Sequence, residues 1–106
     1  MPSILPDADA FDVPVYGTIF GGRPAVLARL TVGDRLILVP DPAGVEPLSV
    51  WVHALGGDVI GHLAPDINRW MVPRMLAGAR YSASVLSLGA ADTESWKRLI
   101  VSIVRV

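Results

Sequence analysis

Residues 35–63 constrain the fold of this chain more than any other stretch. They contain three short apolar runs, RLILV, SVWVHAL and VIGHL, separated by a proline-rich loop and a Gly-Gly-Asp turn. Apolar runs of this length between turn signals are typical of buried β-strands. Prolines cannot donate to a strand ladder, so residues 40–48, which contain three of them, are expected to form a loop. The last two runs are expected to pair through a hairpin at residues 56–58.

Further strand-like segments flank this stretch on both sides. They are rich in β-branched and aromatic residues, or they alternate between apolar and polar positions with the period of two that a strand requires. Residues 35–39 are apolar on both faces, which favours a closed barrel or sandwich over an open sheet with one wet face. The six strands are expected at residues 13–20, 35–39, 49–55, 59–63, 81–88 and 99–106.

Two segments have the composition of helices. Residues 65–77 begin with Pro65, which suits a first helical turn, and are followed by Gly78, while Pro73 is expected to kink or split the helix. Residues 23–30 are compatible with a helix of about two turns. Together, these elements predict a mostly β fold, a small OB-like antiparallel β-barrel of five to six strands with one or two short helices.

The length of the chain bounds its organisation. A chain of 106 residues is sufficient for one domain with one hydrophobic core. Residues 1–12 contain prolines and acidic residues without periodicity, so they are expected to form a loosely ordered leader. Residues 13–106 are then expected to form a single barrel domain.

Composition excludes several classes of protein. The absence of cysteine excludes disulfides, thiolate nucleophiles and Cys-ligated zinc. No apolar run approaches the roughly 20 residues that span a bilayer. The N-terminal segment is acidic rather than basic and does not resemble a targeting signal. We therefore expect a cytoplasmic protein without membrane contact.

The charge balance is weak evidence against nucleic-acid binding. The formal net charge is −1, but three of the 10 acidic residues precede Val13, which leaves 9 basic residues against 7 acidic ones. All the basic residues except Lys97 are arginines, whose planar guanidinium suits phosphate contacts. This balance neither requires nor excludes a nucleic-acid surface.

No catalytic constellation is recognisable. The serines have no G-x-S-x-G context, and the double glycines match neither a P-loop nor a dinucleotide-binding fingerprint. His53 and His62 fall on paired strands with Asp58 in the turn between them, but this spacing matches no established metal-ligand pattern. We therefore expect no enzyme activity, no metal and no cofactor.

The aromatic residues are the best candidates for a binding surface, because rings can stack on unpaired bases. Tyr16 and Trp70 are expected in the core. Phe20 lies at a strand end, between strand residues and two glycines followed by Arg23, and suits the core and a ligand equally. Trp51 is expected to point outward from its strand, where it would cover the leader, form a dimer contact or meet a ligand.

From about Val15 to Val106 the chain resembles the HIRAN domain, a small module fused to chromatin-remodelling helicases and nucleases and also free-standing in bacteria. The correspondence rests on short motifs in the family's order and spacing, and the chain is identified as a free-standing, divergent member. The motifs are Val15-x-Gly17-x-x-Phe20, Leu30-Thr31-Val32-Gly33-Asp34 before a strand, Asp41-Pro42 at the start of a loop, and Ile60-Gly61-His62-Leu63.

The resemblance implies a barrel related to the OB-fold that binds single-stranded DNA, in characterised eukaryotic members at a free 3′ end. By position, the family's pocket falls on Phe20, on Val45 and Glu46 in the loop, and on His62. Together with the nearby Arg23, Phe20, Glu46 and His62 form the expected nucleic-acid interface. Two interpretations of His62 stay open, a polar group that lines the pocket and a strand-end residue satisfied locally.

A second hypothesis assigns the barrel to protein interaction or self-association without DNA binding. The loop reads Val45-Glu46-Pro47-Leu48, with Val45 in place of the family's tyrosine, and Trp51 is expected to point outward. An apolar loop beside an exposed tryptophan is typical of an interaction surface. The candidate partners are therefore single-stranded DNA, another protein or a second copy of this chain.

Overall fold

A computed structural model describes residues 8–44, 47–89 and 98–106 of the chain. Within these residues the chain forms six strands and two helices. The strands are β1 (Ala10–Pro14), β2 (Arg35–Pro40), β3 (Val50–Ala54), β4 (Val59–His62), β5 (Tyr81–Leu88) and β6 (Leu99–Arg105). The helices are α1 (Arg23–Leu27) and α2 (Pro65–Leu76).

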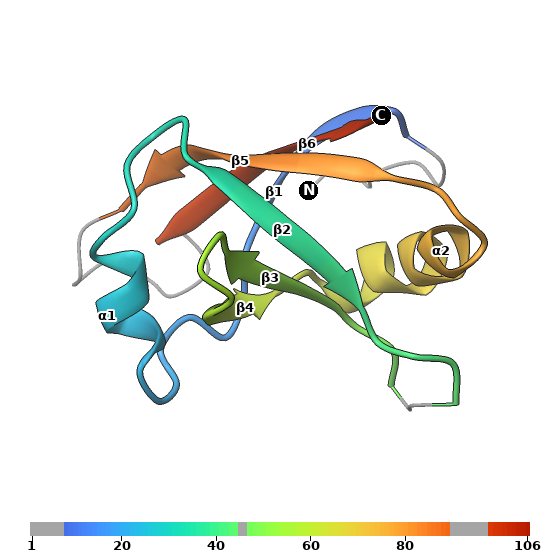
Figure 1. Ribbon diagram of the computed structural model, residues 1–106, viewed down its shortest axis with the longest axis horizontal. Helices are drawn as coiled ribbons and strands as arrows, with labels where there is room; N and C mark the ends of the chain where they lie inside the picture. The colour runs from blue at the N-terminus through green and yellow to red at the C-terminus, as the bar shows by residue number, and fades with distance from the viewer. Residues whose placement is uncertain (1–7, 45–46, 90–97) are drawn as a thin grey trace.

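The strands form one antiparallel sheet with the order β1-β6-β5-β2-β3-β4. Figure 1 shows the sheet curling from β6 and β5 through β2 to β3 and β4, with α1 and α2 at opposite ends. The prediction of a mostly β, barrel-like antiparallel fold with short helices is confirmed. No helix in the described ranges is long and apolar enough to cross a membrane.

A short backbone pairing brings the two edges of this sheet together. The Val15 N–H donates to the Leu99 carbonyl of β6 at 2.9 Å. The next residue, Tyr16, exchanges two hydrogen bonds with His62 of β4, at 2.8 and 3.0 Å. Because β1 and β4 are the two edge strands, the segment that leaves β1 closes the curled sheet along this seam.

Gly61 makes the close approach at the seam possible. A Cβ atom at Gly61 would overlap the Tyr16 carbonyl oxygen and would lie 2.7 Å from Cγ1 of Val15. Ile60 and Leu63 are fully buried, so β4 is held inward by its own core side chains. Packing therefore explains the Gly-x-Leu pattern of the sequence. Position 61 has no room for a side chain, and position 63 places its side chain in the core.

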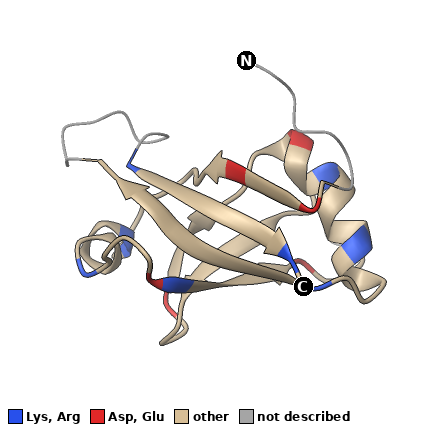
Figure 2. Cartoon of the chain, turned by 90° about the horizontal axis from the view of Figure 1, so that it is seen from above, with Lys and Arg blue, Asp and Glu red and all other residues tan. Residues whose placement is uncertain are grey.

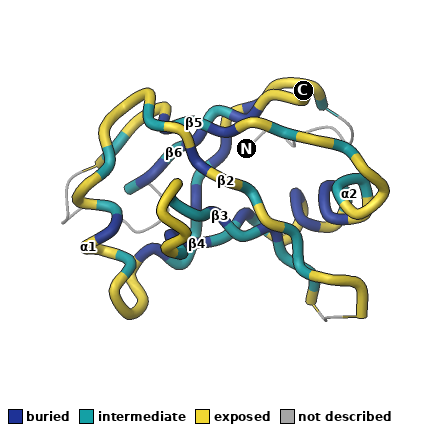
Figure 3. Tube along the Cα trace, viewed as in Figure 1, coloured by how far each residue is buried: buried dark blue, intermediate teal, exposed yellow. Residues whose placement is uncertain are grey.

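The core lies inside the curl of the sheet and beneath α2 (Figure 3). Helix α2 contributes Ile67 and Met71, which share one face at the i, i+4 spacing. Trp70 is half-buried and packs edge to face against Phe11, with ring centroids 5.6 Å apart, so it joins the margin of the core as expected. The largest fully buried side chains are Ile60, Leu63, Met71, Leu99 and Ile103.

Buried Asn68 fixes α2 against the strands next to it. Its Oδ1 accepts the Val50 N–H at 3.0 Å, and its Nδ2 donates to the Leu63 carbonyl at 3.0 Å. Both bonds are buried, where an unpaired amide costs about 1–3 kcal/mol. The start of β3 and the residue after β4 therefore keep a fixed position relative to the helix.

The first strand begins earlier than the composition suggests. The sequence predicts a strand over 13–20, but β1 spans Ala10–Pro14 and so enters the segment expected to be a loose leader. Phe11 and Val13 are buried while Asp12 points outward, which is the alternation of a half-buried strand. The acidic and proline residues concealed this period. The rest of the expected leader, residues 1–7, lies outside the described residues.

Strand β2 is buried on one face, which corrects the expectation for residues 35–39. Leu36 is buried, but Ile37 and Val39 are 41% and 39% exposed. The apolar composition of both faces suggested burial of both. The outer face of this strand instead lies away from the core and continues the surface that β3 and β4 present.

The helices also differ in detail from the sequence prediction. Helix α1 ends at Leu27, three residues before the predicted end. The chain continues to Leu30 in tighter turns, in which the N–H groups of Arg29 and Leu30 donate to carbonyls three residues earlier, at 3.1 Å each. Helix α2 runs unbroken from Pro65 to Leu76, so Pro73 does not split it. The Ala77 N–H still bonds to the Pro73 carbonyl at 3.0 Å, which continues the helical pattern past the proline.

Gly61→Ala is expected to destabilise the protein by about 1–3 kcal/mol, the usual range for an overpacked site. The new methyl group would collide with the backbone of Tyr16 at the seam. Urea unfolding followed by circular dichroism measures the effect. Gly56→Ala is the matched control, because a Cβ at Gly56 meets no atom within 4 Å. Equal stability of the two variants would contradict the role of the seam.

Candidate nucleic-acid interface

Four side chains align in one row across the outer face of the barrel. Val39 of β2 pairs with Trp51 of β3, and Trp51 pairs with His62 of β4. His62 in turn bridges to Tyr16 at the seam. Residues directly opposite one another in neighbouring strands share a face of the sheet. Both chain neighbours of Trp51 are fully buried, so the row faces outward, as the alternation of the strand predicts.

The three rings of this row contact one another. His62 lies between the other two rings. It stacks on Tyr16 with centroids 6.4 Å apart and an interplanar angle of 23°. It meets Trp51 edge to face at 5.6 Å and 78°. Aromatic pairs of this geometry are mutually attractive. The rings therefore form one continuous, half-buried surface.

Arg23, the first residue of α1, places a guanidinium group beside this surface. Its Cζ lies 5.7 Å from the ring centroid of Trp51 and 5.9 Å from that of Phe20, which are cation–π distances. Its Nη1 donates to the Gly17 carbonyl at 2.7 Å. Among the described residues, no carboxylate forms an ion pair with Arg23. Its positive charge is therefore uncompensated there.

Asp41 orients Trp51 and closes the base of the loop after β2. Its Oδ1 accepts the indole N–H of Trp51 at 2.9 Å, and its Oδ2 accepts the Ser49 N–H at 3.0 Å. The Asp41 N–H donates to the Ser49 carbonyl at 2.9 Å. One carboxylate thus holds both the ring and the two ends of the loop.

The imidazole of His62 has two differently placed nitrogens. Nδ1 lies 3.0 Å from the Leu63 carbonyl oxygen. A carbonyl oxygen only accepts hydrogen bonds, so Nδ1 carries a proton. Nε2 faces Gly17, as its distance of 3.1 Å from a Cβ built there shows. The ring is thus satisfied locally at one nitrogen and presents the other to the seam, which combines the two interpretations that the sequence left open.

Two open hollows adjoin the row. The first, of about 530 Å³, extends from His62 to the start of α2 and is lined by Pro47, Leu48, Ser49, His62, Pro65, Asn68 and Arg69. The second, of about 500 Å³, lies between α1 and the β3–β4 hairpin and is lined by Phe20, Gly21, Gly22, Arg23, Val26, Asp58 and Val59. The first hollow shares His62 with the row, and the second is lined by Arg23, whose guanidinium lies beside Trp51.

The structure brings together three of the four site residues predicted from the sequence. Phe20, which is 61% exposed, contacts Arg23, and both Arg23 and His62 contact Trp51. Glu46 lies outside the described residues, as does Val45. Tyr16 was expected in the core, but it is half-buried in the outer row, because the seam turns its side chain outward.

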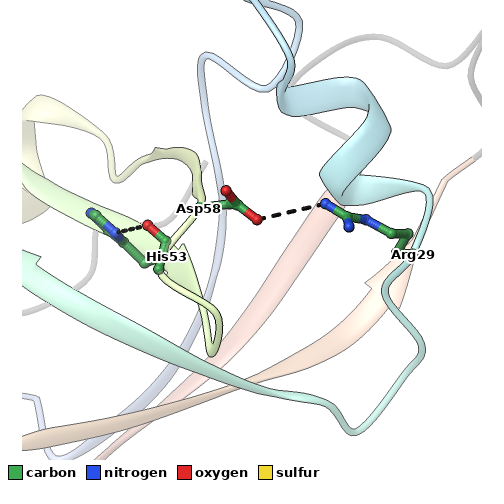
Figure 4. Close-up of polar contacts among 4 residues, drawn as sticks. Arg29, His53 and Asp58 are labelled. Carbon is green, nitrogen blue, oxygen red and sulfur yellow. Dashed lines mark hydrogen bonds and ion pairs between the residues drawn. The ribbon is translucent and has the colours of Figure 1, made fainter.

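His53 does not join His62. Its Nδ1 lies 3.0 Å from the Gly57 carbonyl of the hairpin, and the adjacent Asp58 pairs with Arg29, which follows α1, at 3.6 Å (Figure 4). Both partners of this ion pair are more than half exposed, so it contributes little to stability. In residues 8–44, 47–89 and 98–106, no group of three or more His, Cys, Asp or Glu side chains is placed to hold a metal.

The charged residues are spread over the molecule. Figure 2 shows basic residues on both helices and at strand ends, with acidic residues interspersed. A broad basic surface would bind any nucleic acid through its phosphates. Here the described charges do not gather into such a surface, so the row of rings and the guanidinium of Arg23 distinguish this face from the others.

Comparison with known proteins supports the fold. No protein-family model and no curated protein matches the chain. A solved structure of a protein from Lactobacillus plantarum, a northeast structural genomics consortium target, matches with a TM-score of 0.64 and 22% sequence identity. The match covers 92% of this chain and 91% of that chain. At this identity the likeness shows that the two chains share a fold.

Asp41→Ala is expected to destabilise the protein by about 1–3 kcal/mol, because it leaves two partly buried N–H donors without an acceptor. Asp34→Ala is the matched control, since the Asp34 carboxylate accepts the Thr31 N–H in an exposed turn. Urea unfolding compares the two. If Asp34→Ala lost as much stability as Asp41→Ala, the role assigned to Asp41 would be wrong.

Proposed function

We propose that this protein binds single-stranded nucleic acid, and single-stranded DNA in particular, across the outer face of β2, β3 and β4. The observation that carries the proposal is the row of Tyr16, His62 and Trp51 with the guanidinium of Arg23 beside it. Every base has an apolar ring face, so an unpaired strand stacks on such rings without regard to sequence. The cation meets the phosphates between the bases.

The resemblance to the HIRAN domain points in the same direction. Phe20 and His62, which correspond by position to the family's pocket, lie on either side of the contact between Arg23 and Trp51. HIRAN domains bind single-stranded DNA, in characterised eukaryotic members at a free 3′ end. A strand end that enters the hollow beside His62 would meet the start of α2 and Arg69.

The rigidity of the ring row favours binding. Trp51 is held at its indole N–H by Asp41, at its edge by His62 and near its face by Arg23. A side chain that is already ordered loses little conformational freedom when a ligand stacks on it, whereas ordering a mobile side chain costs about 0.5–1.5 kcal/mol. The stacking energy is therefore largely retained as affinity.

Trp51→Ala is expected to weaken binding of a labelled oligothymidylate with a 3′-hydroxyl end by about ten- to a hundredfold, because one stacked base contributes about 1–3 kcal/mol. Fluorescence anisotropy at low salt measures the affinity. Trp51→Phe keeps a ring and should retain most of the binding. His53→Ala, on the same face of β3 but tied to the hairpin, should bind like the wild type.

Two results would contradict the proposed function. One is the absence of wild-type binding at tens of micromolar protein. The other is an affinity that does not change with salt, since each phosphate contact on a single strand adds a slope of about −0.7 to the logarithmic salt dependence.

Self-association is a second candidate function of the same face. Ile37 and Val39 are exposed apolar residues on β2, and Val39 is the direct neighbour of Trp51 in the row. Exposed apolar side chains that adjoin one another are typical of interaction surfaces. Of the loop that the sequence assigned to this surface, Pro47 and Leu48 are described, and Leu48 is half-buried.

If self-association is the function, light scattering should give twice the chain mass of 11.3 kDa for the wild type. The double variant Ile37→Ser and Val39→Ser should give the monomer mass, because it removes apolar area from the shared face. Leu86→Ser, at an exposed apolar position on β5, should remain a dimer. A monomeric wild type at about 100 μM excludes a dimer of the micromolar affinity that a small specific interface has.

A further inference from the structure

The sheet is split between β2 and β5. Among the described residues, the pairing of these strands ends where Leu36 meets Ala83. Strand β2 nevertheless runs on to Pro40, and β5 begins at Tyr81, two residues before Ala83. Figure 1 shows the two strands diverging beyond their short pairing. A continued register would place Leu38 opposite Tyr81, so these two residues mark the first missing pair of the ladder.

The backbone of Leu38 faces this split. The Asp34 carbonyl accepts the Val85 N–H of β5 at 2.9 Å, and the backbone groups of a strand alternate between its two neighbours. Leu38, four residues after Asp34, therefore directs its N–H and carbonyl toward β5. The Asp41 N–H points the other way and donates to the Ser49 carbonyl, as the alternation requires. Leu38 thus presents a donor and an acceptor on a side of β2 where the described ladder has ended.

A hollow of about 300 Å³ opens at the split. Residues of both strands line it, together with Leu55, which follows β3. Ile37 and Leu55 are apolar lining residues that are exposed to solvent, at 41% and 65%. The volume is that of about ten water molecules in the liquid. A short stretch of polypeptide with an apolar side chain would displace them.

The charge at the hollow is positive. Arg35 is the one charged side chain among the described residues that line it. It forms no ion pair with a carboxylate of the described residues. Its neighbour Asp34 has its carboxylate engaged, because Oδ2 accepts the Thr31 N–H at 2.9 Å. A partner with an acidic residue beside its apolar ones would therefore complement this hollow.

The outer edges of the sheet are less available for pairing. Tyr16 takes the place beside His62 of β4, and α1 packs against the same strand. The edge of β1 carries Asp12 and ends at Pro14, and a charge and a proline both discourage pairing with another strand. The run Leu36–Val39 contains neither feature. The split is therefore the described edge that is least protected against an added strand.

We propose that the split between β2 and β5 binds an extended peptide segment of a partner protein, which pairs with Leu38 as an added strand. The segment has apolar residues at alternate positions and an acidic residue beside them. Its backbone exchanges hydrogen bonds with Leu38, its apolar side chains contact Ile37 and Leu55, and its carboxylate meets Arg35. The site uses the edge of β2 and not the row of rings, so it goes beyond the proposed nucleic-acid binding and does not depend on it.

The peptide acetyl-Asp-Val-Ser-Val-Ser-Val-amide is a suitable probe, with an expected Kd of about 0.1 mM. Solvent exchange of the Leu38 N–H, followed by nuclear magnetic resonance, should slow about tenfold at ten times the Kd, when about a tenth of the protein is free. The Val39 N–H faces β3 and should change little. The same peptide with every backbone N–H methylated should not bind, because it cannot donate to the Leu38 carbonyl.

Protein variants test the two ends of the contact. Arg35→Ala should bind the peptide about two- to fivefold more weakly, but it should match the wild type with a peptide that has alanine in place of the acid. Arg69→Ala, at a different hollow, is the matched control and should bind the original peptide like the wild type. Leu38→Pro removes the N–H and should bind at least tenfold more weakly, provided that circular dichroism shows a folded protein.

Three results would overturn the peptide site. One is equal affinity for the methylated and the unmodified peptide. Another is an unchanged exchange rate of the Leu38 N–H at peptide concentrations up to about 1 mM. The third is a wild-type dimer, seen by light scattering, that the peptide dissociates, because a second copy of this chain would then occupy the split. None of them bears on oligothymidylate binding, which is measured separately.

Discussion

The close approach of the Tyr16 backbone to Gly61 is the contact on which the rest of the structure depends. It joins the segment after β1 to β4 and so connects the two edges of the sheet. The same contact determines what lies on the outside. With Leu63 buried and Gly61 against the Tyr16 backbone, His62 faces outward beside Trp51. The seam that closes the barrel therefore also assembles the row of rings.

The seam also brings α1 to the site. After Tyr16 the chain turns at Gly17, whose carbonyl accepts a hydrogen bond from the guanidinium of Arg23. Arg23 then lies beside both Phe20 and Trp51, although Trp51 belongs to a strand far along the sequence. Structural closure and the proposed binding face thus use adjacent atoms. A change that opens the seam would move the cation and the histidine together, so it would disturb both the stability of the sheet and the proposed face.

Alternation of apolar and polar residues predicted the strands well where one face is exposed to solvent and that face carries polar residues. The predicted range of β5 agrees with the observed Tyr81–Leu88 because its serines and apolar residues alternate. The start of β1 was predicted too late because Asp9 and Asp12 resemble loop residues, although Phe11 and Val13 carry the period of a strand. Composition also overstated burial on β2. Apolar residues on both faces indicate two buried faces in a barrel, yet one of them is an open surface.

Local patterns and the family resemblance gave only candidates for the site. They proposed Phe20, Arg23 and His62, which the structure places around Trp51, and the alternation of β3 predicted that Trp51 points outward. Sequence patterns could not supply the cross-strand register that aligns Trp51 with His62 and Tyr16. Net charge could not locate the candidate face either, because it averages the molecule. What distinguishes this face is one guanidinium without a carboxylate partner in the described residues, beside rings of the kind on which the proposed binding by stacking would depend.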